Sequence, residues 1–304
     1  MCLESGAGYQ EMKIAKCIII FLTFLLVSCA ASLPYRSLSG PDIRGALSAF
    51  PMQEDHPDAT AVFLLNYGSM EMFDDGTQVY KHTVRCKILN ERGYYLARKS
   101  ISYREGYSRV KILYANTIRP DGTTVPLREE DIIDSAAYSQ YEEYTDIKEK
   151  KFTMAAIEPG CIVEYAYEVK HTKPFLLHDY YTRFALREFF PVKEKVMEII
   201  LPNGRQLHMA NFKTDIKPTV EEYGGKTKYT FRSENSPEII PEPNMPRPTD
   251  KDVFPQVHCW TLSCWNVISK WYAGLVKEQM QSDEALDDFT RKLTAGKTTD
   301  EDKI

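Results

Sequence analysis

The chain has 304 residues, of which 43% are hydrophobic and 27% charged, the balance of a folded globular protein with one or two domains. This balance excludes a mostly disordered chain, a collagen-like chain and a polytopic membrane protein. The net charge is −5 at pH 7 and no basic block is present, which argues against nucleic acid as a partner. The 19 Tyr and the 12% aromatic content favour strands over helices.

The N-terminus has the features of an export signal. Lys13 and Lys16 precede an apolar run over 17–27, which is shorter than the roughly 20 residues of a transmembrane helix. The run ends in Ser28-Cys29, and this string resembles the lipobox of bacterial lipoproteins, in which a small residue precedes the lipidated Cys. We therefore expect a signal peptide over 1–28, cleavage between Ser28 and Cys29, and a lipid on Cys29. A plain secretory signal with a chance Cys is the alternative.

The residue after the lipidated Cys also indicates the membrane to which the lipoprotein is sorted. Ala30 follows Cys29 at the place where inner-membrane lipoproteins of enterobacteria often have Asp, so the resemblance favours the outer membrane over the inner one. The protein would be lipid-anchored to the bacterial envelope and face the periplasm or the cell surface. Met12 opens a more typical signal than Met1, which leaves two candidate starts.

Short strands separated by turns fill the middle of the chain. After a Ser-, Pro- and Gly-rich tether over 29–57, with a short helical stretch near 43–50, Asp75-Gly76 predicts a type I′ hairpin turn. Further turns are expected at 120–123, 158–160, 203–204 and 224–225. The next strand places Tyr80, His82, Val84, Cys86 and Ile88 on one face, and strands are also expected at 110–118, 161–169, 180–189, 194–201, 206–213 and 227–232. Many short strands at this spacing predict a mainly β protein, an antiparallel β-sandwich over 58–236.

A proline-rich segment over 237–250 marks the end of the predicted sandwich, because such a segment is extended and stiff. Residues 251–304 are predicted to be helical. Trp265, Ile268, Trp271, Tyr272, Leu275 and Val276 share one face of a first helix, and Leu286, Phe289 and Leu293 would point inward from a second helix over 282–294. Thr298 and Glu301 form a capping-box pattern, which predicts a further helix and favours a chain truncated before another domain. A frayed acidic tail is the alternative.

The sequence offers residues for three kinds of catalytic or metal site, and none of the three is complete. Cys264 at a helix start resembles a papain-like nucleophile, but no His follows it to act as general base. His258, Cys259 and Cys264 could supply three zinc ligands, yet no second pair completes a tetrahedral site, and His171 and His178 fit no known spacing. The acidic pairs are typical of solvated turns and helix starts; they are Asp74/Asp75, Glu129/Glu130/Asp131, Glu142/Glu143 and Asp287/Asp288. We therefore assign no catalytic residue, no metal and no cofactor.

Two further features stay open. Tyr138, Tyr141 and Tyr144 recur every third residue in a polar stretch and could form a face that binds a peptide or a carbohydrate; a flap packed on the sandwich is the alternative. An exported protein can also pair Cys86, Cys161, Cys259 and Cys264, and four Cys allow three connectivities.

Several strings taken in order resemble the bacterial domain-of-unknown-function family numbered 3857. They are Phe73-Asp-Asp-Gly76, the strand from His82 to Leu89, Val110 to Gly122 with Val125-Pro126, Glu158 to Tyr165, and Phe189-Phe-Pro-Val192. Members of that family stand before a transglutaminase-like domain with a Cys-His-Asp triad on a papain-like core. The resemblance implies that residues 298–304 begin that domain, and no triad residue falls within this chain.

These observations lead to three hypotheses. The chain is a non-catalytic accessory or binding domain of a lipid-anchored envelope protein of the transglutaminase-like type, whose partners are the membrane, the missing C-terminal domain and a peptide or envelope component. Alternatively, it is a fragment of a cysteine peptidase or amide-bond transferase. A stand-alone binding lipoprotein is the third hypothesis.

Overall fold

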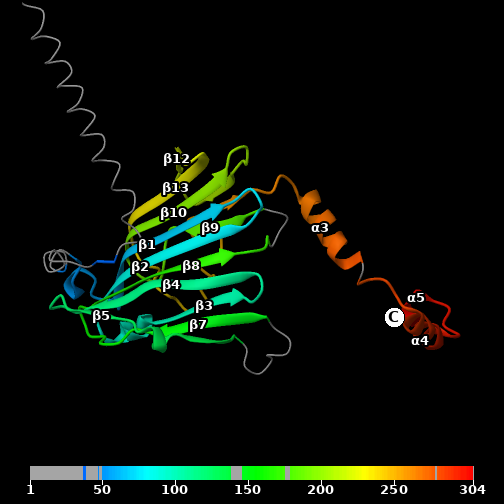
Figure 1. Ribbon diagram of the computed structural model, residues 1–304, viewed down its shortest axis with the longest axis horizontal. Coiled ribbons are helices and arrows are strands. Elements are labelled where there is room, and N and C mark those ends of the chain that lie inside the picture. Colours follow the sequence, from blue (N-terminus) through cyan, green and yellow to red (C-terminus); the bar gives the residue numbers. More distant parts are fainter. Residues whose placement is uncertain are drawn as a thin grey trace, which may run out of the picture.

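The computed structural model describes residues 37–38, 47, 50–137, 146–174, 179–277 and 279–303 (Figure 1). The predicted signal peptide with Ser28 and Cys29 lies outside the described residues, as do Tyr138, Tyr141 and Tyr144. No helix within the described residues is long and apolar enough to cross a membrane.

The protein is mainly β, as predicted, and its centre is one eight-stranded sheet (Figure 1). In spatial order the strands are β12 (Thr219–Tyr223), β13 (Lys226–Ser236), β10 (Val192–Pro202), β1 (Ala61–Met72), β2 (Gln78–Ile88), β8 (Ile162–His171), β4 (Ser108–Ile118) and β5 (Thr124–Pro126). The pairing between β1 and β10 is parallel, whereas the other pairs of this sheet are antiparallel. The sandwich prediction is confirmed, but its large sheet is mixed rather than wholly antiparallel.

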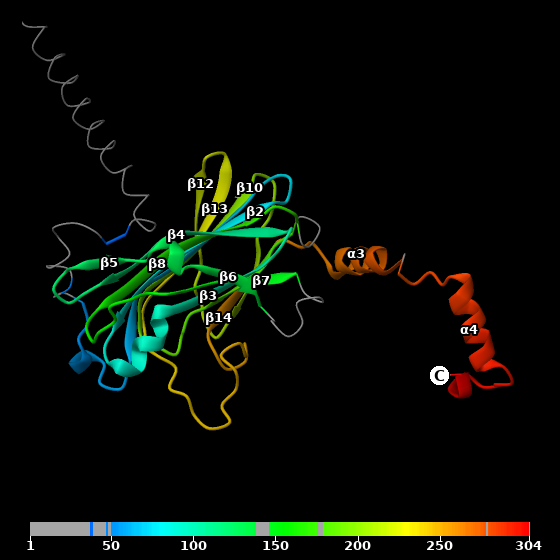
Figure 2. The ribbon, with the colours of Figure 1, turned by 60° about the horizontal axis from the view of Figure 1, so that its bottom comes forward.

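Two three-stranded sheets form the second layer (Figure 2). One has the order β3 (Arg98–Arg104), β7 (Ile147–Thr153) and β6 (Ile133–Ala136), and the other has the order β11 (His208–Phe212), β14 (Gln256–Trp260) and β9 (Tyr181–Ala185). Three short 3-10 helices lie in the connections: η2 (Gln53–Asp55), η3 (Glu91–Ala97) and η4 (Glu129–Asp131). Both small sheets pack on the same face of the large sheet, which we call the inner face.

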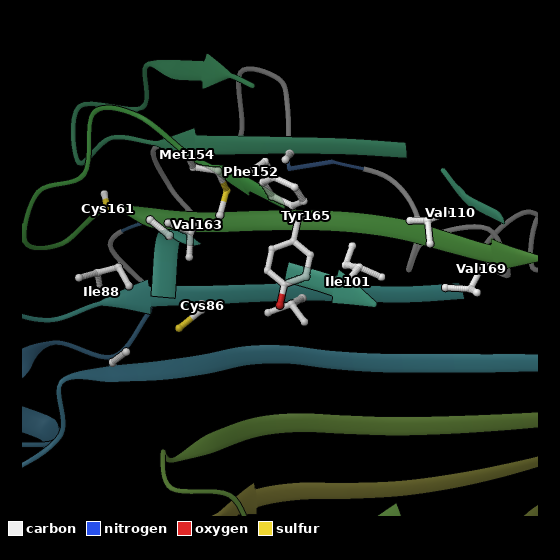
Figure 3. Close-up of a cluster of buried hydrophobic side chains, with 14 residues drawn as sticks. Cys86, Ile88, Ile101, Val110, Phe152, Met154, Cys161, Val163, Tyr165 and Val169 are labelled. Atoms are coloured by element: carbon white, nitrogen blue, oxygen red, sulfur yellow. The ribbon is translucent and has the colours of Figure 1, made fainter. Parts of the chain in front are cut away.

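Separate apolar clusters hold the two small sheets in place. Ile101 of β3 and Phe152 of β7 pack against β2, β8 and β4, where Cys86, Val163 and Tyr165 are buried (Figure 3). The second cluster joins the other small sheet to β1, β10 and β13; its members include Met70, Phe184, Ile199, Phe231 and Val257. Each small sheet therefore covers one half of the inner face, and a seam lies between them.

The predicted turns are present, with one correction to their type. At Asp75-Gly76 only Gly76 has a positive φ, of 79°, so this turn is a type I turn followed by a left-handed glycine and not type I′. The turn at Gly122 repeats this geometry, with a φ of 87°. Between β12 and β13, Gly224 and Gly225 both have positive φ, as a type I′ turn requires.

The C-terminal helices differ from their prediction in burial. The helices α3 (Trp265–Lys277) and α4 (Glu284–Thr294) form as expected, and a short α5 (Asp300–Lys303) follows. However, Leu286, Phe289 and Leu293 are exposed and do not point into a core, and Trp265 is 81% exposed. The cap of α5 is Thr299, whose hydroxyl accepts the Asp302 amide proton at 3.1 Å, and not Thr298 with Glu301.

Residues 251–304 are not helical throughout. The strand β14 follows the proline-rich segment and lies between β11 and β9, so this part of the prediction is wrong. The two partner strands supply the backbone groups that a strand needs on both edges, and buried Val257 and Cys259 fix its inward face. These partners come from more than forty residues earlier in the chain, where no local pattern reveals them.

The opposite, outer face of the large sheet carries a buried carboxylate. Glu164 of β8 is fully buried, and it accepts hydrogen bonds from the Leu38 amide at 3.0 Å and from Asn116 Nδ2 at 3.0 Å. Arg85 Nε lies 3.5 Å from it, and Ser37 also donates to it. Together with Leu38 and Phe50, which pack beside Val62 and Ile162, these bonds attach the described part of the N-terminal segment to the sheet.

We predict that Glu164→Ala lowers the free energy of unfolding by about 3 kcal/mol, because it leaves Arg85 and several donors without their acceptor. The matched control is Glu168→Ala on the same strand, whose exposed pairing with Lys81 at 3.9 Å should be worth less than about 1 kcal/mol. Urea unfolding of both variants measures the difference. Equal losses would contradict the structural role given to Glu164.

Candidate binding pocket

A cavity of about 230 Å³ lies on the inner face, over the junction of β10, β1 and β2 and against β9. Residues of β1, β2 and β10 and of the segment around β9 line it; they include the charged residues Arg183, Glu188, Lys195 and Glu198, and also Asn66, Met70, Tyr80, His82, Thr182 and Phe184. The cavity thus lies between the large sheet and the small sheet that contains β9, at the edge of the second apolar cluster, to which Met70 and Phe184 belong. A cavity lined by apolar side chains with a few polar groups is a usual setting of a ligand site.

The strand register explains the floor of the cavity. Gly68 of β1 lies opposite His82 of β2 and opposite Met197 of β10. A Cβ atom at Gly68 would come 3.1 Å from Tyr80 Oη and 3.4 Å from the ring edge. Gly68 therefore makes room for the Tyr80 ring, which lies beside the His82 ring with centroids 5.9 Å apart.

A hydrogen-bonded chain crosses this floor. His82 Nε2 lies 2.8 Å from Asn66 Oδ1, and His82 Nδ1 lies 3.2 Å from the Tyr167 hydroxyl. This pattern fits a neutral imidazole that donates to Asn66 and accepts from Tyr167. Burial, with smaller effects of the charges on Lys99 and Lys195, lowers the pKa of His82 to about 3, so the ring is neutral at pH 7.

An ion pair forms one wall. Lys195 of β10 lies opposite Asn66 in the register, and its ammonium pairs with the Glu188 carboxylate. The same ammonium lies 5.6 Å from the centre of the Phe184 ring. The Lys195 side chain is largely buried while Glu188 is partly exposed, so the pair joins the interior of the cavity to its opening.

We predict that stability falls as the pH falls below the ordinary His pKa of 6.5. In the unfolded chain His82 binds a proton near its ordinary pKa of 6.5, whereas in the folded chain it binds one only at about pH 3. Between pH 7 and pH 5 this difference lowers the free energy of unfolding by about 2 kcal/mol. Denaturant unfolding of the wild type and of His82→Gln at both pH values tests this. The variant should lose less stability between the two values, and an unchanged pH dependence would show that His82 is not held neutral.

The structure separates the residues of the metal hypothesis. His258 and Cys259 are adjacent on β14 and point to opposite faces; Cys259 is buried, whereas His258 contacts the Tyr181 hydroxyl at 3.2 Å. Cys264 is exposed before α3. No group of three His, Cys, Asp or Glu side chains in the described part of the chain is placed to hold a metal ion.

The four cysteines within the described part of the chain are free thiols. Cys86, Cys161 and Cys259 are buried and Cys264 is exposed, and no pair of them is bridged. Hydrogen bonds from the backbone N–H groups of Val267 and Asn266 lower the pKa of Cys264, which is the direction expected at a helix start. Among the described residues no histidine lies within hydrogen-bond distance of Cys264, so the structure supplies no general base for it.

The acidic pairs have local structural partners. Asp75 Oδ1 accepts the Thr77 amide at 2.9 Å in the first hairpin turn, Asp131 pairs with Arg128 at 2.8 Å, and Asp288 pairs with Arg291 at 2.8 Å. Glu142, Glu143 and His178 lie outside the described residues, as does the predicted Tyr-rich binding face.

Sequence reasoning placed Tyr80 and His82 on one strand face but gave them no site. The missed signal is in β1, where Asn66 and Gly68 interrupt an apolar strand at alternate positions and therefore share a face. A polar residue and a glycine on the buried face of a central strand indicate a place where side-chain packing stops.

The family of this chain is shown by comparison with known proteins. No curated protein matches the chain. A family model described as "Domain of Unknown Function with solved-structure structure (DUF3857)" matches residues 74–240, more than half of the chain. The chain belongs to the DUF3857 family. The matched range runs from the first hairpin turn through β13, so it contains most of the large sheet and both strands that carry His82 and Lys195.

Solved structures resemble this DUF3857 protein to different degrees. One, from Parabacteroides distasonis ATCC 8503 and described as a "putative protease", has a TM-score of 0.69 and 17% identity over 80% of this chain. The match covers 48% of that protein, so this chain spans about half of its length. An M1 zinc metallopeptidase from Deinococcus radiodurans has a TM-score of 0.33 and 12% identity, with 66% of this chain and 42% of that one covered.

Proposed function

We propose that this DUF3857 chain is the non-catalytic accessory domain of a lipid-anchored bacterial envelope protein of the transglutaminase-like type. Its work is to hold a following catalytic domain and to bind a small ligand or a peptide at the envelope. The observation that carries the proposal is the pair of helices α3 and α4, whose apolar faces have nothing to pack on among the described residues.

The helices follow directly from the completed β-fold (Figures 1 and 2). Tyr272 and Leu275 of α3 are exposed, and so are Leu286, Phe289 and Leu293 of α4. An amphipathic helix gains most of its stability from packing its apolar face, so such faces need a partner. A following domain is the nearest partner in the chain, and a stand-alone binding lipoprotein would leave these side chains in water.

The similarity to the Parabacteroides distasonis protein supports the same proposal. The shared fold covers 80% of this chain and about half of that protein, which is described as a "putative protease". We infer that the peptidase or amide-transfer chemistry of such a protein belongs to a segment outside the β-fold. Under this proposal the chain is the accessory domain of a longer peptidase or amide-bond transferase, so the fragment hypothesis and the accessory hypothesis are compatible.

The reading frame beyond the codon for Ile304 tests the accessory role. We expect the frame to continue and to encode Cys, His and Asp in papain-like order, because α3 and α4 need a partner for their apolar faces. Sequencing the source locus decides this directly. A stop codon after Ile304 would contradict the accessory role and leave the stand-alone binding lipoprotein.

The anchor has its own test. We expect Cys29→Ala to move the protein from the membrane fraction to the soluble periplasmic fraction, because no other segment of the mature chain is proposed to carry a lipid. Fractionation followed by immunoblotting measures this, with Cys264→Ala as the control that should stay with the membrane. Membrane retention of the Cys29 variant would mean that the lipobox assignment is wrong.

A further inference from the structure

One corner of the outer face of the large sheet carries several positive charges. On β8, Glu168 and Lys170 lie an even number of residues after Glu164 and therefore point to the same face. Residues directly opposite each other on neighbouring strands also share a face, and β2, β8 and β4 lie side by side (Figure 1). Their register places four cations at this corner, which we call the basic corner: Lys81 and Lys111, which flank Glu168, and Arg109, which lies opposite Lys170.

The fold itself does not account for this charge. Arg109 and Lys170 are like charges directly opposite each other, an arrangement that destabilises a pair of strands. Both are exposed, as is Lys111, and no salt bridge within the described residues involves any of the three. Lys81 pairs with Glu168 at 3.9 Å. Four cations and one carboxylate leave the corner with a net charge of +3, whereas the whole chain has a net charge of −5.

Protection of the sheet edge explains only part of the basic corner. Charged side chains on an edge strand deter pairing with another chain. Arg109 and Lys111 fit that role, because β4 pairs with the edge strand β5 only from Asn116 onward. Lys81 and Lys170 do not fit it, since β2 and β8 are interior strands with a neighbour on each side. A positive surface that extends over three strands therefore fits an anionic partner.

The segment that follows the proposed lipid anchor attaches to the same face. Ser37 and the Leu38 amide both donate to Glu164. Ser37 comes eight residues after Cys29, so an extended chain places the two at most about 29 Å apart. Along β8, Lys170 lies six residues after Glu164, which is about 20 Å. A lipid on Cys29 would therefore keep the outer face within reach of the membrane surface.

We propose that the basic corner docks the β-fold on an anionic phospholipid surface, so that the outer face lies on the membrane and the inner face with its cavity points away from it. The choice of a membrane as the partner rests on the lipid anchor proposed above. Each Lys or Arg close to an anionic bilayer adds to the attraction, which falls off within a Debye length of about 10 Å in 0.1 M salt. The anchor supplies proximity, and the basic corner supplies orientation.

Sedimentation with vesicles tests the docking surface without the lipid anchor. The exported Cys29→Ala protein is mixed with sucrose-loaded phosphatidylcholine vesicles, either pure or with about 30% phosphatidylglycerol, in about 0.1 M NaCl. We expect the partition coefficient to be at least about tenfold larger for the anionic vesicles, and the difference to disappear in about 0.5 M NaCl, because salt screens exposed charges. Equal partition into both kinds of vesicle would overturn the proposal. Binding to neither would also overturn it and would leave an acidic protein surface as the partner.

A triple variant of the same protein assigns the binding to the basic corner. Arg109→Gln, Lys111→Gln and Lys170→Gln together should lower partition into the anionic vesicles about tenfold, to the level of pure phosphatidylcholine. The Tm should not fall, because the repulsion between Arg109 and Lys170 is removed. A folded triple variant that still binds the anionic vesicles as its parent does would overturn the assignment.

The matched control removes the same charge from lysines outside the basic corner. Lys193→Gln, Lys213→Gln and Lys217→Gln replace exposed lysines, and this variant should bind the anionic vesicles as its parent does. Far-ultraviolet circular dichroism shows whether each variant is folded. Equal losses in the two triple variants would show that only the total charge matters and would overturn the assignment to the corner.

A footprint on the lipidated wild type tests the orientation. The protein is reconstituted in vesicles with phosphatidylglycerol and acetylated with a membrane-impermeant N-hydroxysuccinimide ester, and mass spectrometry compares the labelling with that of the detergent-solubilised protein. Lys111 and Lys170 should be protected in the vesicles, whereas Lys217 should be labelled equally in both samples. Full labelling of Lys111 and Lys170 in a protein that stays in the vesicles would overturn the docking and leave the anchor intact. Release of the wild type from the vesicles would instead contradict the anchor.

Discussion

The parallel pairing of β1 with β10 is the constraint on which the rest of the molecule depends. It joins an N-terminal half of the large sheet, β2, β8, β4 and β5, to a C-terminal half, β10, β13 and β12. Each half has its own small sheet and its own apolar cluster. The seam between the small sheets therefore lies over the junction of the halves, and the polar residues of β1 lie under that seam.

The two faces of the sheet use buried charge differently. On the outer face, Glu164 is surrounded by donors from three segments, so its charge is fully satisfied and attaches the N-terminal segment. On the inner face, Lys99 has an aromatic ring where an acid would be expected. Buried charge with complete hydrogen-bond partners favours one conformation, whereas a largely buried charge without a counter-charge costs free energy.

Local chemistry predicted much of the fold. Gly76, Gly122 and Gly160 have the positive φ angles that the turn sequences require, and the strand with Tyr80, His82 and Val84 has the expected face. The sequence does not indicate strands β3 and β7, because lysines share the inward face with Ile101 and Phe152, so that no alternation of apolar and polar residues marks these strands. Strand β14 was missed because its pairing with β9 and β11 is not local.

The candidate pocket could not be predicted for the same reason. His82 and Asn66 are close in sequence, but Lys195 lies beside them only because β1 pairs in parallel with β10, and Phe184 only because the sheet with β9 packs on this face. No residue spacing in the sequence indicates that these side chains lie close together in space. The register shows it, since Asn66 faces Lys195 and Gly68 faces His82.

The position of β10 also governs the order in which the protein can assemble. Tyr67 on β1 and Glu198 on β10, which share a hydrogen bond of 2.5 Å, lie 131 positions apart in the chain. As the polypeptide is made from its N-terminus, β2 can pair with β1, and β8 and β4 can extend the sheet on that side, long before β10 is made. Until then the other edge of β1 presents unpaired backbone groups, which is a template for aggregation. A chaperone that protects the incomplete chain would therefore act at that edge, before the second half of the sheet has been made.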